Sequence, residues 1–521
     1  MVALSRMVVA MHRWSRPRAL LRAGLCVGLL MLTLPAFAAG AVSSATSQSM
    51  VSDEGRRELP PLPAGLRPQS EEAPGSQRKA PPLPAGLGGD GPEPPPLPAG
   101  LGDVPEVDDT PDADRSGPAS LLGGFTGFWE VRAGVRLQND PYEESLSLAE
   151  TRLQLSRDFT AGPGLFRVTG DLIYDHVADD HALDLERGQG WVDLRELYFS
   201  APIAERIDLR AGRQVLTWGV GDLLFLNDLF PKDWNAFFVG RDVEYLKAPS
   251  DAVRLAMYSK SVNLDVVYTP RFDPDRYVDP ARLSFFDPRI GRRAGRDVDF
   301  DPVVPDDWFA DDEWALRLHR MIGGWELAGY GYRGYWKSPA GFDPASGRPR
   351  FPRLDVYGAS VRGPVGAAIV SGEVAWYLSR EDRTGRDPFV PNDQFRLLLA
   401  YERELVADVT LGFQYYLERT LDHGALLATL PPGQVPPDAW RHLLTTRLTW
   451  LTHAQNVTWS LFAFVSPGDD DAYLRGSWHW KFTDQWSVSA GFNAFHGRRD
   501  SSFFGQFENN SNAWLALRRG F

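Results

Sequence analysis

The sequence predicts an all-β fold: an antiparallel transmembrane β-barrel of about 18 strands, within a range of 14–18, behind a disordered Pro-rich N-terminal region. Three observations lead to this prediction. Segments of about ten residues alternate apolar and polar side chains, and a tilted strand of that length crosses a bilayer. The connections between the segments are alternately long and short. The chain also opens with an export signal that contains its single cysteine, so the folded part can form no disulfide.

Residues 1–38 are predicted to be a signal peptide that is cleaved on export. Five arginines, the last of them Arg22, precede an apolar run over 23–34, and Ala36 and Ala38 supply a small-x-small cleavage site. The run is shorter than the roughly 20 apolar residues that a spanning helix needs, which disfavours a membrane anchor. Cleavage removes five positive charges, so the net charge goes from −13 to −13 − 5 = −18. Such an acidic exported chain argues against nucleic acid as a partner.

Residues 39–118 are predicted to be a disordered periplasmic tail. They are dominated by Pro, Gly, Ser and acidic residues, which cannot bury enough apolar surface to offset the entropy of ordering. The unit PPLPAGL occurs three times, at 60–66, 81–87 and 95–101, and favours the extended polyproline II form. The tail is either a stiff spacer or a docking segment for a periplasmic protein, since repeated motifs give avidity. The residues that would dock are Pro60, Leu62, Pro81, Leu83, Pro95 and Leu97.

Residues 119–521 are predicted to form the barrel. In one segment, apolar side chains at odd numbers from Trp129 to Leu137 alternate with Glu130, Arg132 and Arg136 at even numbers. This two-residue period is typical of a strand with one apolar face. Eighteen such segments are expected to begin near residues 126, 145, 164, 190, 206, 252, 261, 313, 324, 353, 366, 393, 407, 441, 456, 472, 485 and 511.

The connections favour a membrane barrel over a soluble fold. Short ones such as 322–324 and 405–408 alternate with long ones such as 218–251 and 271–312. Short periplasmic turns and long outer loops are typical of outer-membrane barrels. An even number of strands also places both ends of the barrel on the periplasmic side. A soluble β-sandwich, the rival fold, would have to bury all of these apolar faces in one core, and they are too many.

The last segment of the chain predicts where the protein is assembled. Ala513, Leu515, Leu517 and Arg519 share one face, and the terminal Phe521 is expected to be the signal that the outer-membrane assembly machinery reads. Arg519 lies near the strand end, where a long side chain can reach lipid headgroups. The expected location is therefore the cell outer membrane, with its lipids and lipopolysaccharide as surroundings.

Two acidic stretches raise the question of a metal site. One, from Asp175 to Asp184, includes His176 and His181, and oxygen and imidazole ligands at this density could hold a divalent ion. The other, over 297–313, does not follow the spacing of a calcium loop. Solvated outer loops are favoured for both, with Ca²⁺ or Mg²⁺ bridging to lipopolysaccharide as an alternative for the second. No resident metal and no cofactor are expected.

The protein is expected not to be an enzyme. No serine stands in a G-x-S-x-G setting, and the sequence has neither a P-loop nor a c-type haem motif. An outer-membrane hydrolase stays an alternative, because several histidines could each supply half of a catalytic dyad: His319, His423, His442, His453, His479 and His496.

Two groups of residues carry a resemblance to a known family. The first group is Leu194-Arg195-Glu196-Leu197-Tyr198, Gly212-Arg213-Gln214, Trp218-Gly219, Asn227-Asp228, Pro231 and Asp233. The second is Phe503-Phe504-Gly505-Gln506-Phe507 with Asn510-Ser511-Asn512. Together they resemble a largely uncharacterised, porin-like family of proteobacterial outer-membrane barrels, similar in pattern to alginate-export channels. The resemblance implies a barrel with a pore over residues 125–521 and no known enzymatic role.

The connection 218–251 is expected to fold into the barrel and narrow its pore, because it is too apolar for a loop in water. The expected constriction residues are Arg213, Gln214, Trp218, Asp222, Asn227, Asp228 and Asp233. Strict alternation would send Arg213 outward, so a kink or bulge at Gly212 is expected to redirect it toward the lumen or rim. There, a carboxylate of Asp222, Asp228 or Asp233 would be in reach. The alternative is that Arg213 reaches out at the membrane boundary.

These features predict a channel that passes small solutes or exports a substrate, with selectivity set by charged lumen residues and by the folded-in loop. Two alternatives stay open. One is a non-conducting scaffold or secretion partner that recruits a periplasmic component through the PPLPAGL repeats. The other is the outer-membrane hydrolase.

Overall fold

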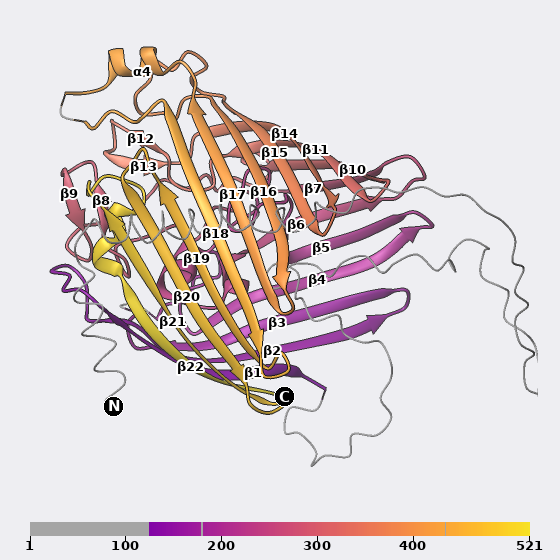
Figure 1. Ribbon diagram of the computed structural model, residues 1–521. Helices are drawn as coiled ribbons and strands as arrows, with labels where there is room; N and C mark the ends of the chain where they lie inside the picture. Colours follow the sequence, from indigo (N-terminus) through magenta and orange to yellow (C-terminus); the bar gives the residue numbers. More distant parts are fainter. Residues whose placement is uncertain (1–123, 179–180, 433) are drawn as a thin grey trace, which may run out of the picture. The chain divides into compact units, whose positions relative to one another are not determined.

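The computed structural model describes residues 124–178, 181–432 and 434–521 (Figure 1). The predicted signal peptide and the three repeats lie outside the described residues. Among the helices of the described ranges, none is long and apolar enough to cross a membrane.

Eighteen strands form one closed antiparallel sheet, which confirms the predicted fold class. Each strand pairs with its neighbours in chain order, and β22 pairs with β1 from Phe128–Gly520 to Arg136–Asn512, which closes the barrel. The strands are β1 Thr126–Arg136, β2 Leu146–Ala161, β3 Gly164–Asp175, β4 Val192–Ala204, β5 Ile207–Val215, β6 Pro249–Met257, β7 Asn263–Thr269, β10 Glu313–Ile322, β11 Trp325–Tyr335, β14 Arg353–Val365, β15 Ala368–Ser379, β16 Gln394–Val406, β17 Val409–Thr420, β18 Trp440–Thr452, β19 Val457–Ser466, β20 Asp471–Lys481, β21 Trp486–Gly497 and β22 Asn512–Gly520. Every one of them begins within about three residues of its predicted start.

The smaller elements all lie in connections. Two pairs of three-residue strands form separate sheets: β8 (Phe285–Asp287) with β9 (Arg292–Ala294), and β12 (Gly341–Asp343) with β13 (Arg348–Arg350). Helices α3 (Trp234–Val239) and α4 (His423–Thr429) and the 3₁₀ helices η1 (Val243–Leu246) and η2 (Gly505–Asn510) complete the described structure. The sequence did not predict these elements, because so few residues cannot display a two- or 3.6-residue period.

The two ends of the barrel differ as predicted. All the long connections lie at one end, on the left and upper left of Figure 1 with α4, β8, β9, β12 and β13, and the short turns lie at the other. The chain enters and leaves the barrel at the short-turn end. There the backbone N–H of Gly127 donates to the carbonyl of Phe521 at 3.1 Å, and the N–H of Phe521 donates back at 3.0 Å.

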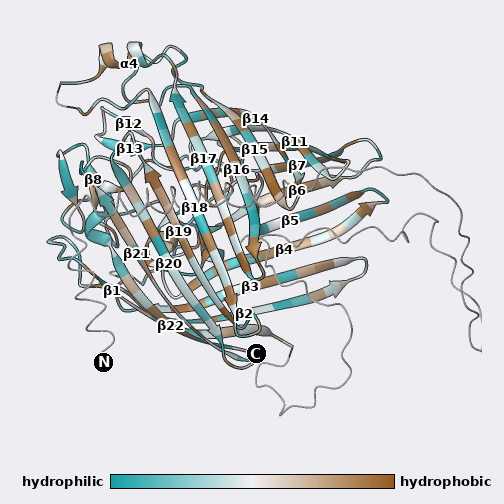
Figure 2. Cartoon of the chain, viewed as in Figure 1, coloured by the Kyte–Doolittle hydropathy of each residue, from teal (hydrophilic) through white to brown (hydrophobic). Residues whose placement is uncertain are grey.

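The two faces of the wall have opposite character, and Figure 2 shows the alternation of apolar and polar residues along the strands. On β1, Trp129 and Val131 are 38% and 41% exposed, whereas Glu130 and Arg132 are 4% and 2% exposed. A wall with charged residues buried inside and large apolar residues exposed outside is the inverse of a soluble protein.

Aromatic side chains cluster on the outer face near both ends of the strands. Near the long loops, the rings of Tyr268 and Trp314 lie 4.5 Å apart, and near the short turns those of Phe166 and Phe199 lie 4.8 Å apart. On β18, one exposed tryptophan lies near each end of the strand: Trp440 near the long loops and Trp450 near the short turns. Ten residues at about 3.3 Å each, tilted by about 40°, separate the two tryptophan levels by roughly 25 Å, which is the height of the apolar band of a membrane barrel.

Candidate functional site

The connection between β5 and β6, residues 216–248, folds into the barrel as expected. Its apolar side chains are buried together with inward-facing side chains from strands all around the wall. From the loop these are Leu216, Leu223, Leu226, Phe230, Phe237, Phe238, Val239 and Leu246; from the wall they include Val356, Leu398, Tyr416, Phe462, Tyr473 and Phe495. We call residues 216–248 the inner loop.

Helix α3 anchors the centre of the inner loop. Asp233 caps its N-terminus by accepting a 2.7 Å hydrogen bond from the backbone N–H of Ala236, and Gly240 ends it in the left-handed conformation, with φ of 95°. Three wall side chains donate to carbonyls at its C-terminal end: Arg475 to Phe237 at 3.3 Å, Asn512 to Phe238 at 3.0 Å and Arg132 to Gly240 at 2.6 Å. The wall thus satisfies carbonyl groups that a helix end leaves free.

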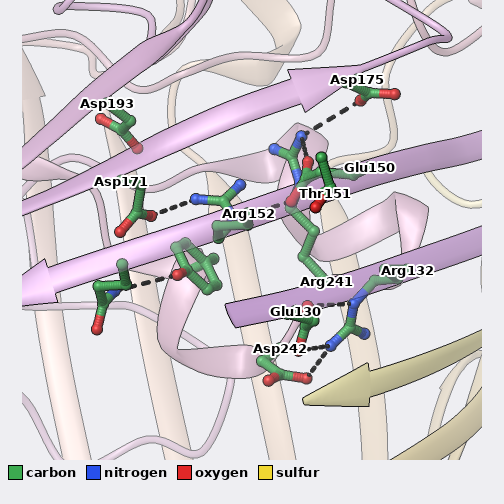
Figure 3. A network of polar contacts seen from close by, with 12 residues as sticks. Glu130, Arg132, Glu150, Thr151, Arg152, Asp171, Asp175, Asp193, Arg241 and Asp242 are labelled. Carbon is green, nitrogen blue, oxygen red and sulfur yellow. Dashed lines mark hydrogen bonds and ion pairs between the residues drawn. The ribbon is translucent and has the colours of Figure 1, made fainter. Parts of the chain in front are cut away.

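Just after the helix, ion pairs fasten the inner loop to β1 and β22. Asp242 accepts from Arg132 at 2.7 Å (Figure 3). It also accepts from Arg518. Both arginines pair with Glu130 as well, at 2.9 Å each. Burial alone would raise the pKa of Asp242, but the guanidinium groups of Arg132 and Arg518 outweigh it and hold that pKa below its usual range. Asp242 is therefore a carboxylate at neutral pH.

A second row of charges continues this network onto β2 and β3 (Figure 3). Arg241 of the inner loop donates to Glu150 at 2.5 Å, and Glu150 accepts from Arg152 at 2.8 Å. Arg152 also pairs with Asp171. The alternation of charges leaves each buried group with a partner of opposite sign, which buried ions require. These residues are not among the predicted constriction residues, although acid–arginine pairs two residues apart at inward positions of β1 and β2 are a signal that points to them.

The first half of the inner loop is held by Glu373, an inward residue of β15 that is 1% exposed. Glu373 accepts from the backbone N–H of Asn227 at 2.8 Å, from its side-chain amide at 2.9 Å and from the N–H of Val220 at 3.1 Å. Asn227 lies so close to β14 that a Cβ added to Gly358 would overlap its side chain. The carboxylate of Glu373 thus holds the inner loop at two positions, Val220 and Asn227.

Three further predicted constriction residues hold the inner loop in place. Asp222 lies 3.0 Å from Arg447 of β18, and burial, partly opposed by that arginine, raises the pKa of its carboxyl. Asp228 pairs with Lys232 at 3.0 Å and accepts from Thr217 at 2.7 Å. Trp218 packs its ring 4.9 Å from that of Phe230 and 6.2 Å from that of Tyr330. A small cavity, barely large enough for one water molecule, separates this part of the loop from the wall beside Ala315 and Val356.

Arg213 does not have the expected partners. It pairs with Asp251 at 2.6 Å and lies 3.4 Å from Glu186, and it donates to the carbonyl of Leu185 at 2.9 Å. The carboxylates expected to reach it have other partners, because Asp222 and Asp228 pair as described and Asp233 caps α3 and faces Arg276 at 3.5 Å. Arg213 lies on the face of the sheet opposite to Gly212 and Gln214, at the rim, where the β3–β4 connection covers it.

Gly212 has a positive φ, but the strand has no bulge there, and Arg213 is not redirected. The φ of Gly212 is 123°, and an added Cβ would overlap the backbone of Leu197, yet the pairing of β5 with both neighbours runs through it unshifted. The alternation of faces therefore continues to Gln214, which is fully buried and donates to the carbonyl of Ala252 at 2.9 Å. Five of the seven predicted residues thus belong to the inner loop itself, whereas Arg213 and Gln214 lie on β5.

The acidic stretches and histidines are dispersed in the described part of the chain. Asp175 pairs with Arg282 at 2.7 Å, whereas Asp184 caps a turn in its own connection. The carboxylates of Glu186, Asp251 and Asp273 come within 4.8 Å of one another, but Arg213 pairs with two of them. The six candidate histidines are spread over β10, α4, β18, the β18–β19 turn, β20 and β21. His479 forms a hydrogen bond with Ser489 at 2.8 Å, and His319 lies 3.5 Å from Asp265.

Comparison with known families and curated proteins gives one match. The profile of a family described as "Protein of unknown function (DUF1302)" matches residues 139–381. That range includes the predicted motif residues between Leu194 and Asp233 but not those between Phe503 and Asn512. No curated protein matches the chain. The resemblance to alginate-export channels stays a prediction.

The chain is similar to several solved structures at low sequence identity. It is similar to OccAB3 of Acinetobacter baumannii, with 11% identity and a TM-score of 0.44 over 76% of this chain and 99% of that one. It is similar to OccK11 (OpdR) of Pseudomonas aeruginosa, with 10% identity and a TM-score of 0.44 over 76% and 95% of the chains. For OmpF of Salmonella typhi, solved with daunomycin, the values are 9% and 0.38 over 76% and 97%.

Proposed function

We propose that the protein is a porin-like channel of the cell outer membrane whose pore is narrowed by the inner loop. The observation that carries the proposal is the course of that loop across a charged lumen, inside a wall whose outer face is apolar. Soluble proteins rarely expose contiguous apolar patches above a few hundred Å², so a wall of this kind fits a bilayer. Charged groups along the inside fit an aqueous path.

The path would open toward the short turns and be narrow at the inner loop. Below the loop, inward-facing charged residues pair with one another: Arg254 pairs with the buried Asp265 at 2.7 Å, and Arg317 pairs with Glu326. At the level of the loop, side chains from β1, β15, β18 and β22 contact it. A route past so many contacts would admit only small polar solutes, or would need the loop to shift.

Single-channel recording in planar bilayers tests the proposal. The wild-type protein is expected to give small conductance steps, and deletion of 222–240 is expected to enlarge them. A matched control deletes 423–435 from the β17–β18 connection, around α4, and is expected to conduct like the wild type. Equal conductance for all three proteins would refute the role of the inner loop, and the absence of steps from all three would refute the channel.

The tail repeats support a second candidate, a secretion partner or scaffold. Three copies of PPLPAGL would raise the affinity for one periplasmic protein through avidity. A peptide of residues 55–105 used as bait in a periplasmic extract would be expected to retain such a protein, and a control peptide with Leu62, Leu83 and Leu97 changed to Ser would not. Equal retention by both peptides would count against this function.

A further inference from the structure

The outer face of the wall carries arginines near the short turns. Arg320 on β10, Arg403 on β16 and Arg519 on β22 are all exposed. Each continues a row of outward apolar residues on its strand: Leu318 is 43% exposed, Tyr401 is 41% exposed and Leu517 is 38% exposed. The three guanidinium groups therefore lie on the outside of the barrel, at three separate places around it.

The acidic strand residues of the same half face the lumen instead. Asp265 is 3% exposed and pairs with Arg254, and Glu326 pairs with Arg317. The strand alternation also places Asp158, Glu196, Asp208, Glu402 and Glu404 inward. The remaining acids of this end, Glu205, Asp408 and Asp484, lie in turns. Within the described residues, the outward strand positions near the short turns thus hold cations and no carboxylate, and none of the three arginines has an ion pair.

The opposite rim has a different arrangement. There, outward arginines occur together with outward carboxylates: Arg213 pairs with Asp251, and Arg380 lies 3.8 Å from Asp355. Arginines at that rim thus stand among carboxylates on the same face. Within the described strands, the short-turn end differs because its outward positions hold arginines and no carboxylate.

We infer that these three arginines bind the phosphate groups of anionic phospholipids in the leaflet on the short-turn side. Arg519 lies over the ring of Trp486 at 5.6 Å and pairs across the sheet with Trp129, so its guanidinium lies at the aromatic level, where headgroups begin. A guanidinium group matches the geometry of a phosphate with two parallel hydrogen bonds. The inference rests on the proposed membrane location, and it adds a lipid preference that a channel function does not require.

Native mass spectrometry of the purified full-length barrel tests the inference. The barrel is titrated with phosphatidylglycerol or phosphatidylcholine of the same acyl chains, and phosphatidylglycerol is expected to bind more tightly. Replacement of Arg320, Arg403 and Arg519 by Gln is expected to remove that preference, by about fivefold for each arginine, which corresponds to about 1 kcal/mol. Replacement of the three by Lys is expected to keep most of it.

A matched control changes three exposed outward arginines of the opposite rim, Arg333, Arg353 and Arg419, to Gln and is expected to keep the preference. Heat-modifiable migration in gels verifies that each variant is folded. Equal binding of the two lipids by the wild type, or an undiminished preference in the Gln variant, would overturn the inference. Flotation with phosphatidylcholine vesicles reports separately on membrane insertion, so failure of the proposed location gives a different result.

Discussion

Truncation of Phe238 tests whether packing holds the inner loop across the lumen. Phe238 is 2% exposed, and its ring lies 4.8 Å from that of Phe507, 5.4 Å from Phe495 and 5.9 Å from Tyr473. Changing it to Ala leaves a cavity between α3 and the wall, and such truncations cost about 3–5 kcal/mol. The cost falls on the inner loop, because backbone hydrogen bonds between neighbouring strands hold the wall independently.

A loss of 3 kcal/mol raises the population of a displaced inner loop by roughly 150-fold. Single-channel recording should therefore show long dwells at a higher conductance in Phe238→Ala that are rare in the wild type. Phe413→Ala is the matched control, because it removes the same atoms from an outward position that is 43% exposed and has no contact with the lumen. If the Phe238→Ala and Phe413→Ala traces have equal dwell times at high conductance, side-chain packing does not hold the loop.

Three further predictions concern charges. Asp233→Ala removes the cap of α3 and should lower the free energy of unfolding by about 1–2 kcal/mol, seen as a lower urea midpoint of the heat-modifiable band. Asp233→Ser should recover most of that loss, because a serine hydroxyl can cap the same backbone N–H. Arg132→Gln should lower the free energy of unfolding by about 3 kcal/mol in the same assay, because Glu130 and Asp242 stay buried with Arg518 as their partner. Arg333→Gln, which changes an outward arginine, should have no measurable effect. Burial, reinforced by Glu313 and Asp251 and opposed by Lys337, raises the pKa of Asp273 in the β7–β10 connection to about 7. The folded state then binds a proton that the unfolded chain has released, so stability should fall as pH rises from about 4 to 7, and Asp273→Asn should flatten this slope; an equal slope in both proteins would contradict the assignment.

The strands of the wall could be predicted closely because the pattern that identifies each strand lies within that strand. A strand between lipid and lumen must alternate along its own length, as Trp129 and Glu130 do, and each such segment can be recognised without knowledge of its neighbours. The apolar content of 218–251 was sufficient in the same way to predict that this connection folds inward. Both features follow from the tendency of apolar side chains to leave water.

The partners of individual side chains were not predictable in this way. Arg213 and its true partner Asp251 lie on neighbouring strands, and their pairing depends on the register of β5 against β6, which the turn and loop lengths do not give. Glu373 holds Asn227 across a separation of 146 residues. Such contacts are set by where a loop lies inside a closed barrel, and a single sequence carries no local record of that position.

The seam between β1 and β22 bears on the order of assembly. Residues of the inner loop bond to Arg132 on one side of the seam and to Asn512 and Arg518 on the other. These bonds can all form only when the barrel is closed with the inner loop inside it. Their contribution to closing the seam therefore depends on the interior being filled.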